Sequence, residues 1–247
     1  MKNEVDSEPN RLGPDDAAEV LDLISTGYEP HVLAGSVYSS DKALAYLRDV
    51  ICDNDNHFYG YFLGNELACV IHLKILEEWI HLNHIVTVDH YKGRGFASAM
   101  MSFVLRIANS YNKSVSLDVD SENGTVKSWY ASFGFMDVDS EKKQLLTSDG
   151  HECDFLKKVS LDDNGPWSSY GVDFGRLQID NFGLEIPVGL VSPCTFNINS
   201  AFLREGVADY ILTQNRGCSI VAHGPDSLSD SEFFKKEWVA YRMVRKV

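Results

Sequence analysis

The sequence predicts an α/β protein with a mixed sheet, in which a larger first part is followed by a small α+β domain. Apolar residues recur at helical spacing in some segments and alternate or run together in others, so helices and strands follow one another along the chain. Near the centre a strand pattern leads into a glycine-rich turn and then a helix, a connection typical of α/β folds. The turn-rich stretch Asp162–Pro166 has the composition of a linker and divides the 247 residues into parts 1–161 and 162–247.

Residues 1–161 are expected to begin with two helices. Pro14 and the two acids after it begin the first, and Ser40 and Asp41 begin the second. The next two strands form a hairpin around the Gly64–Asn65 turn. In chain order, the elements after the helices are strands 58–62, 67–73 and 79–88, helix 97–109, strand 115–119, helix 126–133 ended by Gly134, and an apolar strand within 151–161.

Residues 162–247 are expected to form a smaller set of elements. Pro187 lacks a backbone N–H, so the strand that contains it is predicted to lie at a sheet edge. The expected elements are strand 174–180, the edge strand 184–191, a helix from Asn199 or Ser200 to about Thr213 closed by Gly217, and strands 218–222 and 238–244.

The composition excludes several classes of protein. The chain has 22 basic and 36 acidic side chains and a formal net charge of -14, with no cluster of Lys and Arg for phosphate contacts, so a general nucleic-acid binder is excluded. No apolar run approaches the roughly 20 residues that span a bilayer, and the acidic start lacks the apolar core of a signal peptide. We therefore expect a cytoplasmic protein without a membrane partner.

The five cysteines are widely spaced and include no Cys-x-x-Cys pair. This spacing favours neither a zinc site nor a dithiol centre, and no metal is expected. The residues concerned, expected to be small buried thiols in a reducing compartment, are Cys52, Cys69, Cys153, Cys194 and Cys218.

The segment Thr87–Ser98 is the most informative part of the chain for function. A strand leads into a turn with Gly93 and Gly95, and a helix follows. Glycines allow a ligand to approach the backbone, and the first N–H groups of a helix attract anions, so this turn predicts a diphosphate site. Lys92 and Arg94 add positive charge within an acidic part of the chain. The segment lacks the Lys-Ser/Thr ending of the P-loop, and Ser98 replaces the third glycine of the dinucleotide loop.

A second motif, at residues 123–135, makes the function expected for the glycine-rich turn more specific. It contains Asn123, Val126, Tyr130, Gly134 and Phe135, and together the two motifs resemble the GNAT family of N-acetyltransferases over about residues 10–160. The family's acetyl-CoA loop, Arg/Gln-x-x-Gly-x-Gly/Ala, corresponds to Lys92–Ala97, with Lys in place of Arg or Gln. The family's later motif, Asn-x-x-Ala-x-x-x-Tyr-x-x-x-Gly-Phe, is matched in register by Asn123, Val126, Tyr130, Gly134 and Phe135, with Val in place of Ala.

The resemblance implies a fold, a cofactor and a set of roles. It implies the acyl-CoA N-acyltransferase fold, acetyl-CoA as co-substrate, and Tyr130 as the acid that protonates the departing thiolate. The strand at 86–88 is expected to separate from its neighbour and pair with the pantetheine arm, and the N–H groups of 93–97 to hold the pyrophosphate. The residues expected to bind the cofactor are Val86, Thr87, Val88, Lys92, Gly93, Arg94, Gly95, Phe96, Ala97 and Asn123.

An amine attacks a thioester only after it has lost its proton, so a base is required. In the family a carboxylate often lies on the strand before the loop, and the corresponding position is occupied here by His81, whose ordinary pKa of about 6.5 suits a base. Asn83 should share its face but cannot act as a base. The alternatives are Asp118, Asp120 and Glu122 acting through water, and a purely structural role for His81 also remains open.

The acceptor and the role of residues 162–247 are less defined. Residues 1–160 hold 14 basic and 25 acidic side chains, a net of -11 that favours a cationic acceptor amine, although an acidic surface also serves solubility. Acceptor contacts are expected between residues 28 and 40, with Tyr28, Glu29, His31 and Tyr38 as candidates.

Residues 162–247 are expected to shape the acceptor cleft or mediate association, including a homodimer, and a degenerate second GNAT copy is the alternative. A catalytically inactive module that binds CoA or a protein is the alternative to the enzyme.

Overall fold

The computed structural model describes residues 8–120, 122–149, 159–161, 170, 172–179, 183–191, 194–203 and 206–246. The chain divides into two compact units. Unit 1 consists of Met1–Glu29, Leu44–Ser140 and Tyr241–Val247, and unit 2 consists of Pro30–Ala43 and Glu141–Ala240. Strands β6 (Met136–Thr147) and β12 (Phe234–Arg245) therefore contribute residues to both units.

The sheet of unit 1 is mixed. Its strand order is β1-β2-β3-β4-β5, followed by the unit 1 parts of β12 and β6. Strands β1 to β4 pair antiparallel, and β4 pairs with β5 in parallel. Gly64, with a φ of 62°, makes the turn of the predicted hairpin. The bounds are β1 (Asn10–Arg11), β2 (Asn56–Leu63), β3 (Glu66–Ile75), β4 (Trp79–Thr87) and β5 (Ser114–Asp120).

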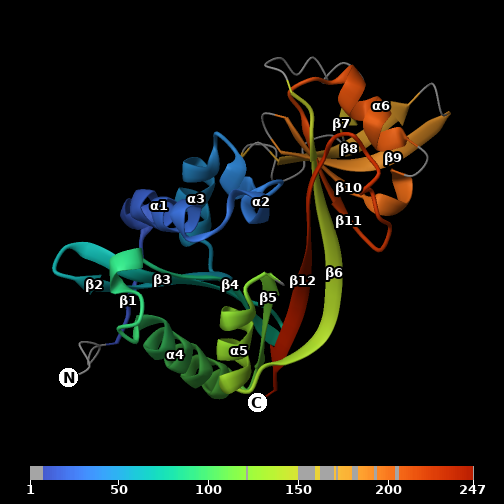
Figure 1. Cartoon of the computed structure of the whole chain (residues 1–247). Helices are drawn as coiled ribbons and strands as arrows, with labels where there is room; N and C mark the ends of the chain where they lie inside the picture. Colours follow the sequence, from blue (N-terminus) through green and yellow to red (C-terminus); the bar gives the residue numbers. More distant parts are fainter. Residues whose placement is uncertain are drawn as a thin grey trace. The chain divides into compact units, whose positions relative to one another are not determined.

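Helices cover both faces of the unit 1 strands. Figure 1 shows α1 and α3 on one side of β2 to β4 and α4 on the other. Met100, Met101 and Val104 of α4 are fully buried against β3 and β4, and each buried side chain of this size contributes about 1.5–3 kcal/mol. The helical elements are η1 (Pro14–Asp16), α1 (Ala17–Gly27), α3 (Ala43–Ile51), η3 (Asp89–Tyr91), α4 (Phe96–Tyr111) and α5 (Gly124–Ser132).

Unit 2 has its own group of strands and its own core. Its strand order is β6-β11-β10-β9-β8-β7, and its core includes Leu177, Phe196, Ile211 and Ile220. The elements are α2 (Pro30–Leu33), η2 (Val37–Ser39), β7 (Val159–Leu161), β8 (Val172–Ile179), β9 (Leu184–Val191), β10 (Thr195–Asn199), η7 (Ser200–Phe202), α6 (Val207–Gln214) and β11 (Ser219–His223).

Unit 2 repeats a backbone pattern of unit 1. In unit 1, β4 is followed by the short helix η3, then by Gly95 with a φ of 95°, and then by α4. In unit 2, β10 is followed by η7, then by Gly206 with a φ of 80°, and then by α6. In both units the next strand returns to pair in parallel with the strand before the turn. The two units thus share the order strand, turn, helix, strand.

Pro187 does not mark a sheet edge, so that prediction is wrong. Strand β9 lies between β8 and β10. The ladder with β10 covers only Gly189–Val191, so the missing N–H of Pro187 falls outside it. The single helix expected from Asn199 or Ser200 to about Thr213 is also not observed. This range contains the short helix η7 followed by the separate helix α6.

The compact units divide the chain at other places than residue 162. Strand β6 already passes from unit 1 into unit 2 at Glu141, and Tyr241–Val247 return to unit 1. The strand expected within 151–161 is described only as β7, which pairs with β8 of unit 2. The expected linker 162–166 lies outside the described residues.

The cysteines differ from the expectation of buried free thiols. Cys69 is buried and free as predicted, whereas Cys52 is exposed. Cys218 is disulfide-bonded, which corrects the expectation for this residue. Cys194 is free and partly buried, and Cys153 lies outside the described residues.

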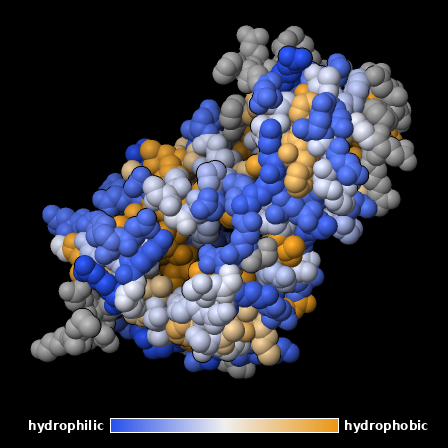
Figure 2. Space-filling model, in the orientation of Figure 1, coloured by the Kyte–Doolittle hydropathy of each residue, from blue (hydrophilic) through white to orange (hydrophobic). Residues whose placement is uncertain are grey.

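Hydrophilic residues dominate the face shown in Figure 2, where hydrophobic residues form scattered patches. In the described part of the chain, no helix combines the length and apolar character needed to cross a membrane.

Candidate active site

Strands β4 and β5 separate to form a fork in unit 1. Their parallel ladder runs from Trp79 with Ser114 to Leu82 with Leu117. Beyond that pair, β4 continues to Thr87 and β5 continues to Asp120. The β4 edge that faces β5 beyond Leu82 therefore offers backbone groups to a ligand. The ladder thus ends before Val86, Thr87 and Val88, whose pairing with the pantetheine arm stays a prediction.

The glycine-rich turn lies at the end of β4 and begins α4. Gly93 and Gly95 have φ values of 78° and 95°, which favour glycine, and Gly95 is the N-cap of α4. The first helical bond runs from the Ala99 N–H to the Gly95 oxygen, so the N–H groups of Phe96 and Ala97 have no acceptor within the helix. A Cβ added at Gly93 or Gly95 would meet no atom within 4 Å. The space beside the two glycines is therefore open, and N–H groups without an acceptor in the helix can bind an anionic ligand there.

The two basic side chains of the turn have different partners. Lys92 forms an ion pair of 2.7 Å with Asp89, and this hydrogen bond holds the pKa of Asp89 below its ordinary value. The Arg94 guanidinium lies 5.2 Å from the centre of the Tyr91 ring. The Tyr91 hydroxyl in turn donates to Glu66, over 2.8 Å.

Tyr130 lies on α5, the helix after β5. Asn123 is the N-cap of this helix, with its side-chain oxygen accepting from the Val126 N–H, so its observed role is structural. Tyr130 is only 5% exposed and packs on Trp129 and Phe135. Burial raises the pKa of its phenol far above the ordinary value, and the neighbouring Tyr28 raises it further. The phenol therefore keeps its proton at neutral pH.

Trp129 connects α5 to the glycine-rich turn. Its indole N–H donates to the Ser98 hydroxyl in the first turn of α4, over 3.3 Å. This bond fixes the helix of Tyr130 relative to the helix that begins at Gly95.

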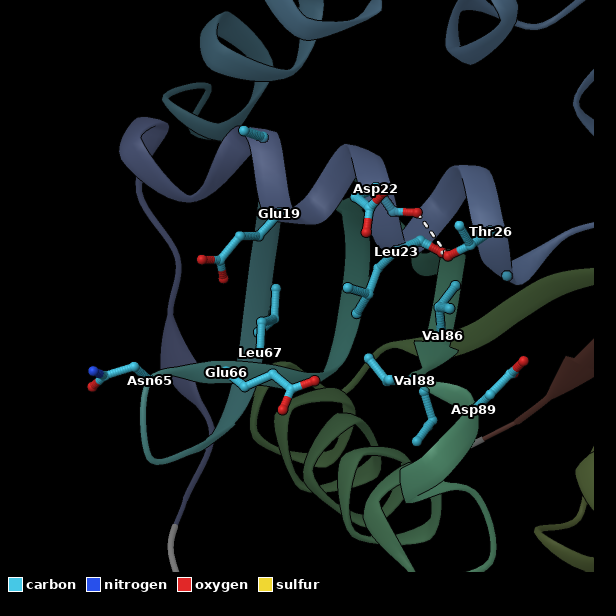
Figure 3. A pocket seen from close by; sticks show the side chains of 13 residues that line it. Glu19, Asp22, Leu23, Thr26, Asn65, Glu66, Leu67, Val86, Val88 and Asp89 are labelled. Carbon is cyan, nitrogen blue, oxygen red and sulfur yellow. Dashed lines mark hydrogen bonds between the residues drawn. The ribbon is translucent and has the colours of Figure 1, made fainter.

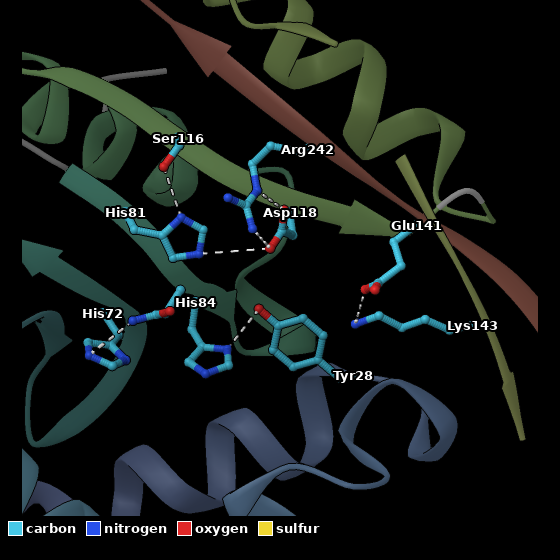
Figure 4. A network of polar contacts seen from close by, with 10 residues as sticks. Tyr28, His72, His81, His84, Ser116, Asp118, Glu141, Lys143 and Arg242 are labelled. Carbon is cyan, nitrogen blue, oxygen red and sulfur yellow. Dashed lines mark hydrogen bonds and ion pairs between the residues drawn. The ribbon is translucent and has the colours of Figure 1, made fainter. Parts of the chain in front are cut away.

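Tyr28 and His84 form a second polar pair beside the fork. The Tyr28 hydroxyl lies 3.2 Å from Nδ1 of His84, and Tyr28 also has a hydrogen bond with the Ile85 backbone (Figure 4). Burial raises the pKa of Tyr28 to about 12 and lowers the pKa of His84 to about 3, so both side chains are neutral near pH 7. The sequence pointed to Tyr28 as an acceptor contact but gave no signal for this pairing.

His81 lies at the base of the fork. Its Nδ1 is 3.0 Å from the Ser116 hydroxyl, and its Nε2 is 4.0 Å from Asp118 (Figure 4). Arg242 of β12 donates to both oxygens of Asp118. Burial lowers the pKa of His81, although Asp118 opposes that effect. The structure thus joins the predicted base to one of its predicted alternatives.

His72 belongs to the same face of the sheet but is a structural residue. It is buried, stacks on Phe58, and its Nε2 lies 2.9 Å from the Asn56 side-chain oxygen. The Asn83 amide is 3.4 Å from the same nitrogen. Burial lowers the pKa of His72 well below its ordinary value, so it remains neutral.

A cavity of about 670 Å³ lies between α1 and the ends of β3 and β4. Its lining includes Val86, Thr87 and Val88, three of the residues predicted to bind the cofactor. Figure 3 shows Glu19 and Asp22 of α1 on one wall and Glu66 and Asp89 near the strand ends. The negative charge of these four carboxylates suits a cationic ligand better than the diphosphate of CoA.

Other candidates from the sequence lie elsewhere. The Asp120 carboxylate accepts from the Glu122 N–H, which closes the turn before α5. Glu29 is exposed in unit 1. His31 packs edge-on against Trp238 within unit 2, and Tyr38 lies in η2 of the same unit.

The fork, the glycine-rich turn and the order of elements define the acyl-CoA N-acyltransferase class of fold. Comparison with known families gives a more specific result, because residues 34–145 match the family model of the acetyltransferase (GNAT) domain. Residues 34–145 therefore match a GNAT domain, and over this range the resemblance inferred from the two motifs is confirmed.

Solved structures extend the likeness over both units. A tandem GNAT protein from the clavulanic acid biosynthesis pathway is 11% identical over 96% of this chain and 98% of its own, with a TM-score of 0.66. A Pyrococcus horikoshii protein inferred to be an acetyltransferase is 12% identical over 97% of this chain and 89% of its own, with a TM-score of 0.58. A similarly inferred acetyltransferase of Thermoplasma acidophilum is 11% identical over 98% and 100%, with a TM-score of 0.56. No curated protein matches the sequence.

Proposed function

We propose that the protein is an N-acetyltransferase that moves the acetyl group of acetyl-CoA to a primary amine. The observation that carries this proposal is the fork of β4 and β5 between the glycine-rich turn and the buried Tyr130. Acetyl-CoA supplies a thioester whose carbonyl carbon is attacked by an amine. The β4 edge beyond Leu82 would hold the pantetheine arm, and the N–H groups from Gly93 to Ala97 would hold the diphosphate.

The proposed proton transfers follow from the protonation states of His81 and Tyr130. Neutral His81 accepts a proton from the amine, whose nitrogen then forms the new bond to the carbonyl carbon. Tyr130 keeps its proton at neutral pH and donates it to the sulfur as the carbon–sulfur bond breaks. The products are the acetylated amine and the free thiol. Tyr28 and His84 lie beside the fork and are both neutral near pH 7, so they add no charge to the site.

Replacing His81 with Gln is expected to lower kcat by about 10²-fold near neutral pH, the range for loss of a general base. Because burial lowers the pKa of His81, the base is active at neutral pH and loses activity as the pH falls through a midpoint below 6.5. In the variant this acidic limb of the kcat/KM profile should disappear. A His57→Gln control, on β2, should leave the rate and the limb unchanged. An unchanged rate in His81→Gln across pH 6–9 would show that His81 is not the base.

The cavity supports a cationic acceptor. Glu19 and Asp22 line it beside Val86, so a second positive charge on the acceptor would find carboxylates there. We expect Asp22→Asn to raise KM for a diamine about 3- to 10-fold, the effect of losing one partly exposed charge contact, and to leave KM for a monoamine and for acetyl-CoA unchanged. The exposed Asp15, outside the cavity lining, supplies the matched Asp15→Asn control. Equal effects on monoamine and diamine would contradict this acceptor class.

Unit 2 is proposed to be a degenerate second GNAT half. It shares the strand, turn, helix, strand order of unit 1, and the chain resembles a tandem GNAT protein along its length. Its parallel pair is closed, however, because all five residues of β10 from Thr195 to Asn199 pair with β11. A closed ladder offers no edge to a pantetheine arm, so cofactor binding is assigned to unit 1 alone.

Calorimetry and a thiol-release assay test the proposal. Titration with acetyl-CoA should show one site per chain, and a panel of mono-, di- and polyamines should then reveal acceptors by release of free CoA. Binding without release on any amine would support the inactive CoA-binding module instead. Absence of binding would contradict both interpretations.

A further inference from the structure

The last strand of the chain brings a charged side chain to the base of the fork. Arg242 lies in the part of β12 that belongs to unit 1. Its Nε donates to one oxygen of Asp118 and its Nη2 donates to the other, over 2.8 Å. Both contacts join residues 124 positions apart in the sequence. Two parallel bonds fix the orientation of the carboxylate, which a single contact would leave free to turn.

Asp118 stands between Arg242 and His81. The Oδ2 atom that accepts from Arg242 is the one that lies 4.0 Å from Nε2 of His81. The other ring nitrogen of His81 is held by the Ser116 hydroxyl at 3.0 Å. The imidazole therefore has one fixed polar partner and faces, at longer range, a carboxylate that is already neutralised by Arg242.

Each charge around His81 acts on its protonation in a known direction. Burial of the ring, which is 18% exposed, disfavours the imidazolium. Asp118 favours it, whereas the positive charges of Arg242 and Lys74 disfavour it. Within the described residues, the ionisable groups of β3, β4, β5 and β12 that interact electrostatically with His81 include His72, Lys74, His84, Asp118 and Arg242.

We propose that Arg242 is a positioning residue of the acetyl transfer. By holding and neutralising Asp118, it keeps His81 unprotonated at the pH at which His81 takes a proton from the amine. The ion pair itself is partly exposed, with Asp118 at 43% and Arg242 at 46%, and pairs of this exposure add little to stability. Its main consequence is thus the proton affinity of His81. This inference rests on the proposed function, in which His81 is the base.

Titration of the His81 ring by NMR, in the full-length protein, tests the inference without relying on catalysis. The His81 signal is identified by its absence in His81→Gln. We expect Arg242→Gln to raise the His81 midpoint by about 0.5–1 pH unit, since the Asp118 charge is then no longer offset. Asp118→Asn should lower it, and Arg242→Lys should keep it near the starting value because the charge remains. His57, on β2, is the internal control and should not move.

The acidic limb of the kcat/KM profile should shift by the same amount and in the same direction as the NMR midpoint. A His81 midpoint that stays in place in Arg242→Gln, while the spectrum remains that of a folded protein, would overturn the inference. If Arg242→Gln does not fold, an unchanged His81 midpoint in Asp118→Asn would overturn it instead. Absence of acetyl transfer in the unmodified protein would contradict the proposed function, and the NMR titration would still decide whether Arg242 controls His81.

Discussion

Replacing Tyr130 with Phe is expected to lower kcat by about 10²- to 10⁴-fold, because the leaving thiolate loses its proton donor. The ring contacts with Trp129 and Phe135 do not involve the hydroxyl, so the variant should fold and bind acetyl-CoA as before. Steady-state kinetics with saturating acetyl-CoA measure the rate, and calorimetry measures the binding.

The pH dependence of this effect has a defined sign. Burial raises the pKa of Tyr130, so the protonated donor persists throughout the neutral range, and the loss in Tyr130→Phe should be constant from about pH 6 to 9. Tyr111→Phe removes the same hydroxyl from an exposed position on α4 and should change nothing. A Tyr130→Phe enzyme with normal kcat would show that another group, or solvent, protonates the sulfur.

Replacing Gly95 with Ala is expected to weaken acetyl-CoA binding by about 10- to 100-fold, a difference of roughly 1.4–2.8 kcal/mol. The φ of 95° disfavours a side chain, and a Cβ would occupy open space beside the turn at which the diphosphate is proposed to bind. The helix would still form, because its first bond uses the Gly95 carbonyl group.

Gly64 supplies a matched control for the backbone strain. It also has a positive φ, of 62°, and a Cβ there would likewise meet no atom within 4 Å. Gly64→Ala should therefore cost a similar roughly 1–2 kcal/mol of unfolding free energy, measured in urea, without changing the affinity for acetyl-CoA. Equal affinities of the Gly95→Ala and Gly64→Ala variants would place the cofactor elsewhere.

Local signals predicted the elements of unit 1 well. The Gly64–Asn65 turn, the helix face of Met100 and Met101, and Gly134 with its φ of 88° each depend on neighbours in the sequence. The glycine-rich turn could also be predicted from the sequence, since Gly93 and Gly95 are close to each other and to the start of α4. Patterns of this kind reflect backbone geometry and helix periodicity.

The features that the sequence did not predict depend on pairings between distant segments. Nothing near Arg242 indicates that it meets Asp118, and nothing near Tyr28 indicates that its hydroxyl meets His84. Pro187 suggested an edge strand because that prediction used only the missing N–H of one residue. In the structure, the ladder between β9 and β10 is short and does not include Pro187. The division into compact units depends on distant pairings in a similar way, since composition does not show that β6 and β12 contribute residues to both units.

The return of β12 to unit 1 has a consequence for biosynthesis. Domains generally fold as units during synthesis, with the N-terminal one first. Here the N-terminal unit includes Tyr241–Val247, so its sheet and the Arg242 contact are completed only after unit 2 has been translated. A ribosome-bound chain that ends at residue 161 would therefore carry the glycine-rich turn and Tyr130 but an unfinished sheet. In the order of synthesis, unit 2 thus lies between the segment with the glycine-rich turn and Tyr130 and the strand that completes their sheet.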